Sequence, residues 1–164
     1  MADDGVDRIL EQWARERPDL DTEAMGTFGR ILRIATAAGD AATATYARVG
    51  ITRGDFDGLA TLRRAGEPFA LAPSALGASL MLTSGGITQR VDRLDHAELV
   101  SRAPDPSDRR GQIVTLTPEG RDLIDAAVAA GLETQQKLLD PLPPDTRREL
   151  DRCLRHLLAA MGAS

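Results

Sequence analysis

Residues Ser84–Gly120 read SGGITQRVDRLDHAELVSRAPDPSDRRGQIVTLTPEG, and this stretch decides the fold. Its first part carries apolar residues at helical spacing, which predicts an amphipathic helix with the stripe Ile87, Val91 and Leu94. A short strand over 99–102, a turn rich in Pro, Asp and Ser, and an alternating strand over 113–117 follow. The pair Thr117-Pro118 then predicts a new helix start. A helix followed by an arginine-tipped β-hairpin is the layout of a winged helix.

Helical periodicity and capping residues predict a helical frame on both sides of this stretch. Before the winged-helix stretch we expect a helix along Val6–Trp13 that Pro18 stops, a longer one from Asp21 or Thr22 toward Tyr46, and a third from a capping-box-like Thr52/Asp55 pair until Gly66. A short helix over 74–80, opened by Pro73, and one over about 84–97 follow. After the wing we expect a long helix capped by Thr117, and a final one capped by Asp145 after the prolines at 141, 143 and 144. The predicted fold is mainly α with a small antiparallel β wing.

Composition supports a globular helical protein and limits its function. The chain has 164 residues, of which 42% are hydrophobic but only 3% aromatic, so Leu, Ile, Val and Ala must form the core. The formal net charge of −5 argues against a non-specific binder of polyanions, although the distribution of charge decides whether a specific one is excluded. Arginine provides almost all positive charge, either because it suits phosphate and guanine or because a GC-rich genome favours its codons.

Cysteine and histidine are too sparse for several kinds of site. Cys153 is the only cysteine, so the sequence predicts no intrachain disulfide and no multi-cysteine metal site, and we expect Cys153 itself to be a buried apolar residue. His96 and His156 are isolated, so no metal and no cofactor is expected. The acidic N-terminus is unlike a signal peptide, and no apolar run has membrane-spanning length. These features predict a cytoplasmic protein without membrane contact.

The short helix over 74–80 and the helix over 84–97 together predict a helix-turn-helix. In such a motif the second helix enters the major groove of double-stranded DNA and presents polar residues to base edges and phosphates. The residues expected to bind DNA are Ser74, Ser84, Gly85, Thr88, Gln89, Arg90 and Arg93, joined by Arg109 and Arg110 at the tip of the wing. Outer polar residues are also typical of any amphipathic helix, so the wing arginines are what favours DNA binding.

These features resemble the MarR family of winged-helix transcription regulators. The resemblance rests on Leu94, the run Leu99-Val100-Ser101-Arg102, the run Asp105-Pro106-Ser107-Asp108-Arg109-Arg110, and the run Val114-Thr115-Leu116-Thr117-Pro118-Glu119-Gly120. It implies a homodimer on a pseudo-palindromic operator, with Arg110 as the wing arginine. The implied division is N-terminal helices for dimerisation and a ligand crevice over 1–50, a DNA-binding lobe over 51–120, and C-terminal dimerisation helices over 121–164. Ala72 departs from the family by replacing a Ser or Thr helix cap.

A narrower resemblance concerns members of this family that respond to urate or related purine and aromatic acids. These members have a tryptophan on an added N-terminal helix, an Asp and an Arg before the helix-turn-helix, and an Arg in the recognition helix. The matching residues here are Trp13, Asp57, Arg64 and Arg90, in that order. Arg102 is a further candidate contact for an anion. Three other interpretations remain open: Trp13 packs in a dimer core, Asp57 and Arg64 form a structural ion pair, and Arg90 touches DNA.

The predicted function is therefore a DNA-binding regulator, in most cases of this family a repressor, that a small anionic or aromatic ligand releases from DNA. Two other classes compete with this prediction. The first is a winged-helix protein-interaction module without DNA binding, which the acidic net charge permits. The second is an enzyme, which the chain argues against because it has no nucleophile–base pair, cofactor loop or metal cluster.

Overall fold

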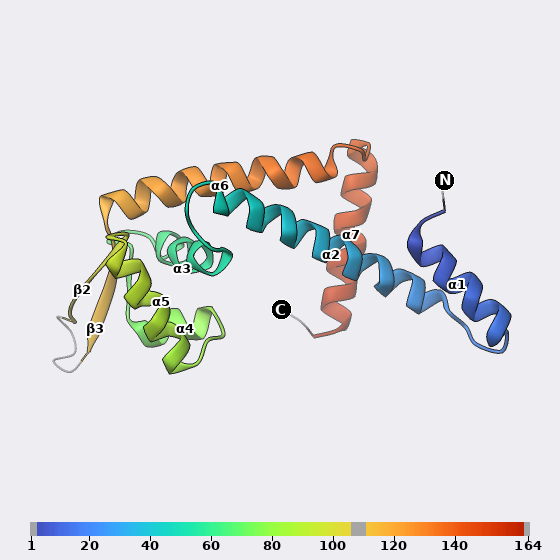
Figure 1. The fold of residues 1–164 in the computed structure, drawn as a ribbon, viewed down its shortest axis with the longest axis horizontal. Coiled ribbons are helices and arrows are strands. Elements are labelled where there is room, and N and C mark those ends of the chain that lie inside the picture. The colour runs from blue at the N-terminus through green and yellow to red at the C-terminus, as the bar shows by residue number, and fades with distance from the viewer. Residues whose placement is uncertain (1–2, 106–110, 163–164) are drawn as a thin grey trace. The chain divides into compact units, whose positions relative to one another are not determined.

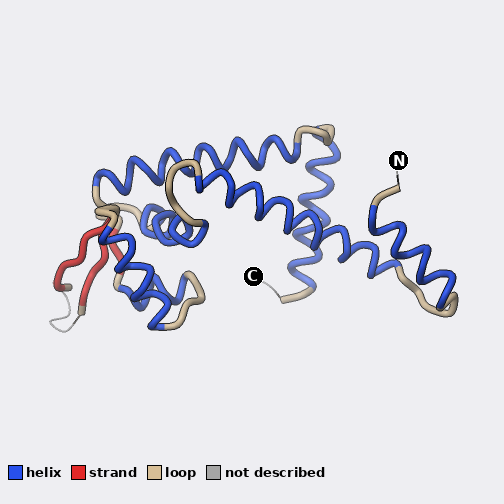
Figure 2. Tube along the Cα trace, in the orientation of Figure 1, coloured by secondary structure: helices blue, strands red, loops and turns tan. Residues whose placement is uncertain are grey.

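The computed structural model describes residues 3–105 and 111–162, and within them it contains seven helices and three strands (Figures 1 and 2). The elements in chain order are α1 Gly5–Glu16, α2 Glu23–Ala47, α3 Arg53–Arg64, β1 Ala70–Leu71, α4 Pro73–Ser79, α5 Ser84–His96, β2 Val100–Pro104, β3 Gln112–Leu116, α6 Pro118–Leu139 and α7 Pro144–Ala160. The predicted mainly helical fold with a small antiparallel sheet is confirmed. The chain forms two compact units, Met1–Ala41 and Ala42–Ser164, whose boundary lies within α2.

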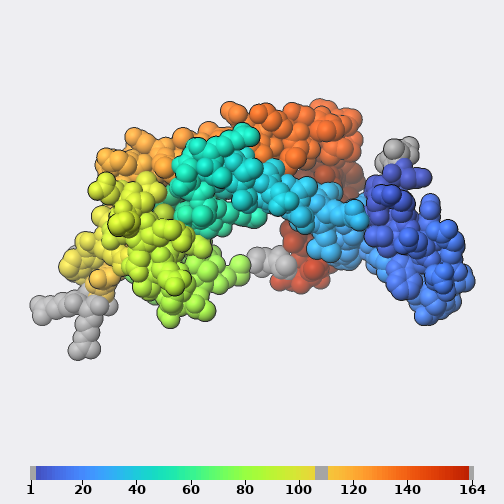
Figure 3. Space-filling model, in the orientation of Figure 1, coloured from blue at the N-terminus to red at the C-terminus, as the bar shows by residue number. Residues whose placement is uncertain are grey.

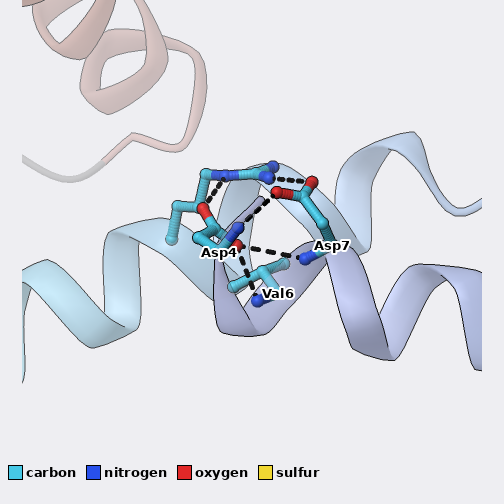
Figure 4. Close-up of polar contacts among 4 residues, drawn as sticks. Asp4, Val6 and Asp7 are labelled. Carbon is cyan, nitrogen blue, oxygen red and sulfur yellow. Dashed lines mark hydrogen bonds and ion pairs between the residues drawn. The ribbon is translucent and has the colours of Figure 1, made fainter. Parts of the chain in front are cut away.

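The N-terminal unit holds α1 against the first part of α2. Asp4 caps α1 by accepting hydrogen bonds from the backbone amides of Val6 at 2.6 Å and Asp7 at 3.1 Å (Figure 4). Arg30 of α2 donates to Asp4 through Nε at 2.8 Å and also pairs with Asp7. The backbone amide of Asp7 and the Arg30 guanidinium are the main groups that lower the pKa of Asp4. Val6 is buried in this unit, where it packs against Gly29.

The second unit contains the hydrophobic core of the winged helix. Its fully buried side chains come from α3 through α6 and include Leu59, Leu62, Leu76, Leu94, Val114 and Ile124. The stripe Ile87, Val91 and Leu94 is buried as its spacing predicts. In the space-filling view the atoms of α4 and α5, light green to yellow-green, form a continuous surface (Figure 3). The helix α5 is therefore packed against the core on one side and exposed to solvent on the other.

The sheet is antiparallel, with strand order β1-β3-β2. β2 and β3 pair from Val100 opposite Leu116 to Pro104 opposite Gln112, which makes the predicted wing hairpin. The strand β1 was not expected from the sequence; its two residues pair with β3, Ala70 with Thr115 and Leu71 with Val114. So short a strand carries no periodicity, and it forms only because β3 offers it a free edge.

Helix caps follow the sequence closely in the winged-helix region. Thr52 and Asp55 form a full capping box and Thr117 caps α6, as expected, and Thr83 caps α5. Ala72 makes no side-chain cap at α4, as its methyl side chain requires.

Two expectations for the last helix are wrong. Its N-cap is Pro143 without a side-chain hydrogen bond, and Asp145 lies inside the first turn. Cys153 is exposed, because α7 buries no residue within the part of the chain that the structure describes. The leucines of α7 lie on a face that no other described residue covers. No helix in the two described ranges has the length and apolar character needed to span a membrane.

Candidate nucleic-acid interface

The helix-turn-helix is formed by α4 and α5, which the turn around Met81 connects. Met81 is 93% exposed and has a positive φ of 52°, so the chain bends sharply here with the side chain in solvent. A shallow hollow between the two helices is lined by residues that include Ser74, Ser84 and Thr88. Three of the predicted DNA-binding residues are thereby brought together on one side of the motif.

The outer face of α5 presents small and polar groups. Ser84, Gly85, Thr88 and Gln89 are exposed, opposite the buried stripe of the same helix. An added Cβ at Gly85 would meet nothing within 4 Å, so the first turn is open to a phosphate or a base edge. The Thr88 hydroxyl donates to the carbonyl of Ser84 at 2.9 Å and is therefore already engaged. Gln89 has the longest uncharged side chain on this face.

Arg90 differs from its expected place on the outer face. It is half-buried, and its Nη1 donates to the backbone carbonyl of Gly54 in α3. A methyl group at Gly54 would overlap the Arg90 guanidinium, so the missing side chain makes this contact possible. The Nε atom of Arg90 is buried and has no hydrogen-bond partner among the described residues. Arg90 is thus turned toward α3 in this structure.

Arg93, one turn farther along α5, pairs with Asp55 of α3. Its Nε donates to Oδ1 of Asp55 at 3.0 Å, and its Nη2 donates to the same oxygen. The carboxylate of Asp55 is 7% exposed, whereas the Arg93 side chain is 52% exposed. Burial raises the pKa of Asp55, but hydrogen bonds from Arg93 and Thr52 outweigh it and hold this pKa below its usual value.

Arg102, at the foot of the wing, is enclosed by two carboxylates of α5. It pairs with Asp92 through Nη2 and lies 3.4 Å from Oδ2 of Asp95 through Nε. Its side chain is 25% exposed. An anion at Arg102 would have to compete with both aspartates.

Asp57 and Arg64 are exposed and lie two turns apart on α3. They form no ion pair with each other in the part of the chain that the structure describes, and Arg64 instead donates to the hydroxyl of Thr61 at 3.2 Å. The structural ion pair considered from sequence is therefore absent here. Asp57 is close enough to act on the buried Tyr46, whose pKa is raised by burial and then by this carboxylate.

The remaining candidates divide between the other unit and the wing tip. Trp13 belongs to the N-terminal unit, where it is 40% exposed on α1. Arg109 and Arg110 lie outside the described residues. Their predicted contacts to DNA stay predictions.

Three carboxylates that pair with the arginines of α5 and β2 were missed from sequence. Asp55 was recognised only as a helix-capping residue, and Asp92 and Asp95 were not singled out. Asp55 and Arg93 are 38 residues apart and Asp92 and Arg102 are 10 apart, so no helical or strand periodicity links the partners. Only the packing of α5 against α3 and β2 reveals them.

A three-helix core with a helix-turn-helix and a two-stranded wing defines a winged helix-turn-helix protein. Comparison with known proteins agrees, since the family model described as MarR family matches residues 49–111. The chain is 36% identical to the HTH-type transcriptional regulator PecS of Dickeya dadantii over 145 residues, covering 88% of this chain and 87% of PecS. The chain therefore belongs to the MarR family.

Solved structures give the same result. A mutant MarR from E. coli complexed with operator DNA matches with a TM-score of 0.68 and 25% identity, covering 84% of this chain and 97% of that one. AbsC, a MarR family transcriptional regulator from Streptomyces coelicolor, shares the fold with a TM-score of 0.72 at 23% identity, covering 88% and 97%.

Proposed function

We propose that this chain is a homodimeric transcription regulator that binds a pseudo-palindromic operator, acts as a repressor, and is released by a small anionic or aromatic ligand. The observation that carries the DNA-binding part is the outer face of α5, where Ser84, Gly85, Thr88 and Gln89 are exposed opposite a buried apolar stripe. Gln89 has the amide geometry that pairs with adenine in the major groove. A pure interaction module has no need of this polar face beside a wing.

The similarity to regulators supports the same function. The MarR that shares this fold was solved with operator DNA, and PecS is named as a helix-turn-helix regulator. A winged helix of this kind reads one half-site, so a two-fold dimer matches a pseudo-palindrome with half-sites about one helical turn apart.

Dimerisation is proposed from the apolar side chains that each unit leaves uncovered. On α7 and at its C-cap the exposed large apolar residues are Leu150, Leu154, Leu158 and Met161. In the N-terminal unit Phe28, Leu32 and Ile34 are exposed as well. Patches of this kind are typical of surfaces that a second subunit covers.

The ligand part of the proposal rests on cations beside a carboxylate on α3. Arg90 contacts Gly54, which lies three residues, about one helical turn, before Asp57. The Nε of Arg90 is buried without a hydrogen-bond partner, so a ligand carboxylate would reach it by turning the side chain outward, and Arg64 offers an exposed cation on α3. Because Arg90 belongs to α5, a ligand that moves this side chain would also move the recognition helix and thereby weaken DNA binding. Urate and aromatic acids fit this chemistry.

The function is tested by a fluorescence-anisotropy titration of the protein on its own upstream intergenic DNA, with a panel of urate and aromatic acids. We expect tight binding that resists competitor DNA and is released by one compound class. Tight binding that no compound releases would remove the ligand part and keep the regulator. Binding no better than to random DNA, repeated with fragments selected from a random pool, would overturn the DNA-binding proposal.

Replacing the wing arginine isolates the electrostatic part of DNA binding. Arg110→Ala is expected to weaken binding to all sequences alike and to lower the slope of log K against log salt by about 1, because a phosphate contact releases about one counterion. Salt titrations of wild type and variant measure this directly. An unchanged affinity would show that the wing contributes nothing to DNA binding.

A further inference from the structure

The recognition helix α5 is held by ion pairs on two of its flanks. On one flank Arg93 reaches back to Asp55 of α3, and on the other flank Asp92 and Asp95 enclose Arg102 of β2. Around a helix Arg93 lies 200° from Asp95 and 100° from Asp92, so the two sets of contacts lie on different flanks of α5. The buried apolar stripe lies between the flanks and provides the packing, while the ion pairs limit rotation of the helix about its axis.

Asp55 is fixed before it meets Arg93. Its Oδ2 accepts hydrogen bonds from the backbone amide of Thr52 at 3.1 Å and from the Thr52 hydroxyl at 2.6 Å. Its Oδ1 remains for Arg93. The Asp55 carboxylate is therefore held in one orientation by the first turn of α3, and the Arg93 guanidinium that binds it is held in a fixed position as well.

We propose that the Asp55–Arg93 ion pair, opposed by Arg102 with Asp92 and Asp95, sets the orientation in which α5 binds DNA, so that Asp55 is a positioning residue and Arg93 acts through it. This inference rests on the DNA-binding function proposed above. It differs from the sequence-based assignment of Arg93 to direct contact with DNA. The contacts with bases then fall to Gln89 and the small residues of the first turn.

If Asp55 positions α5, removing its carboxylate changes the DNA affinity in the opposite direction to that expected from electrostatics alone. Removing a carboxylate from a lobe that binds a polyanion should strengthen binding, because it removes repulsion of phosphate. If Asp55 positions α5, Asp55→Asn weakens binding instead, by about tenfold, which is the size expected for loss of a charge-assisted hydrogen bond. The asparagine keeps an oxygen that can still accept the cap hydrogen bond of α3.

The experiment compares wild type, Asp55→Asn, Arg93→Gln and the double variant on DNA fragments that the wild-type protein selects from a random pool. Each single variant is expected to bind about tenfold more weakly, with a salt slope equal to that of wild type. The double variant is expected to bind no more weakly than the single ones, since both remove the same contact. Asp122→Asn on α6, an exposed carboxylate without an ion pair in the described part of the chain, is the matched control and should not weaken binding.

Three results would overturn the inference. Asp55→Asn could bind as tightly as wild type or more tightly. Arg93→Gln could lower the salt slope by about 1, which marks a phosphate contact. The two losses could also add in the double variant. A thermal melt checks folding, and Arg93→Gln, which leaves the capping box untouched, decides the matter if Asp55→Asn is unstable. Failure of the wild type to select any DNA would instead reject the DNA-binding function, and this inference with it.

Discussion

Leu154→Glu/Leu158→Glu is expected to separate the protein into monomers and to weaken operator binding by about a hundredfold or more. The two leucines are 39% and 52% exposed and lie on one face of α7 with Leu150 and Met161. Among the described residues of α7 none is buried, and in the proposed dimer a second copy supplies the apolar contacts of this helix. A carboxylate placed in such an interface loses its hydration without a partner, which opposes association.

The loss in DNA binding follows from the loss of the second half-site contact. Two linked lobes bind the second half-site at a high effective concentration, which strengthens binding by about 10² to 10⁴ over one lobe. Analytical ultracentrifugation and anisotropy on the same samples measure both effects. His156→Glu, on the polar side of the same helix, is the matched control and should leave the dimer intact. A double variant that remains dimeric would remove α7 from the interface.

Gly120→Ala is expected to lower the free energy of unfolding by about 3 kcal/mol, the upper part of the range for overpacking a rigid site. Gly120 is buried in the first turn of α6, where an added Cβ would overlap the carbonyl oxygen of Leu99. The Leu99 carbonyl is a backbone group, and hydrogen bonds hold it in place. The amide of Thr117 donates to the same Leu99 carbonyl at 3.2 Å, and the Thr117 hydroxyl donates to the Glu98 carbonyl at 2.8 Å. The start of α6 cannot move away without breaking these hydrogen bonds to the segment between α5 and β2.

Chemical denaturation at one fixed protein concentration measures this loss, since stability of a dimer depends on concentration. Gly85→Ala is the matched control, because Gly85 also lies in the first turn of a helix and its added Cβ meets open space. We expect Gly85→Ala to leave stability unchanged or to raise it by about 0.5 kcal/mol. Equal effects of the two substitutions would show that α6 adjusts to a side chain at position 120.

Local chemistry in the sequence predicted most of the winged helix. The Thr52/Asp55 capping box and the Thr117-Pro118 helix start both appear in the structure, because each depends on neighbours within a few residues. The prediction for α7 was wrong at its N-cap, where consecutive prolines set the backbone and left Asp145 inside the helix. Cys153 was expected to be buried because it lies among leucines, but the face they share is uncovered.

The sequence by itself determined the family, the order of the helices and the wing, because periodicity, caps and turns act over a few residues. It also determined that the buried stripe of α5 faces the core. Only the tertiary structure decided which arginines remain open to a ligand or DNA. Arg90, Arg93 and Arg102 look alike in the sequence, yet each is engaged by a group on another element. The physical reason is that a long charged side chain binds a favourable partner that lies close in space, and the packing of α3, α5 and β2 determines which groups lie close.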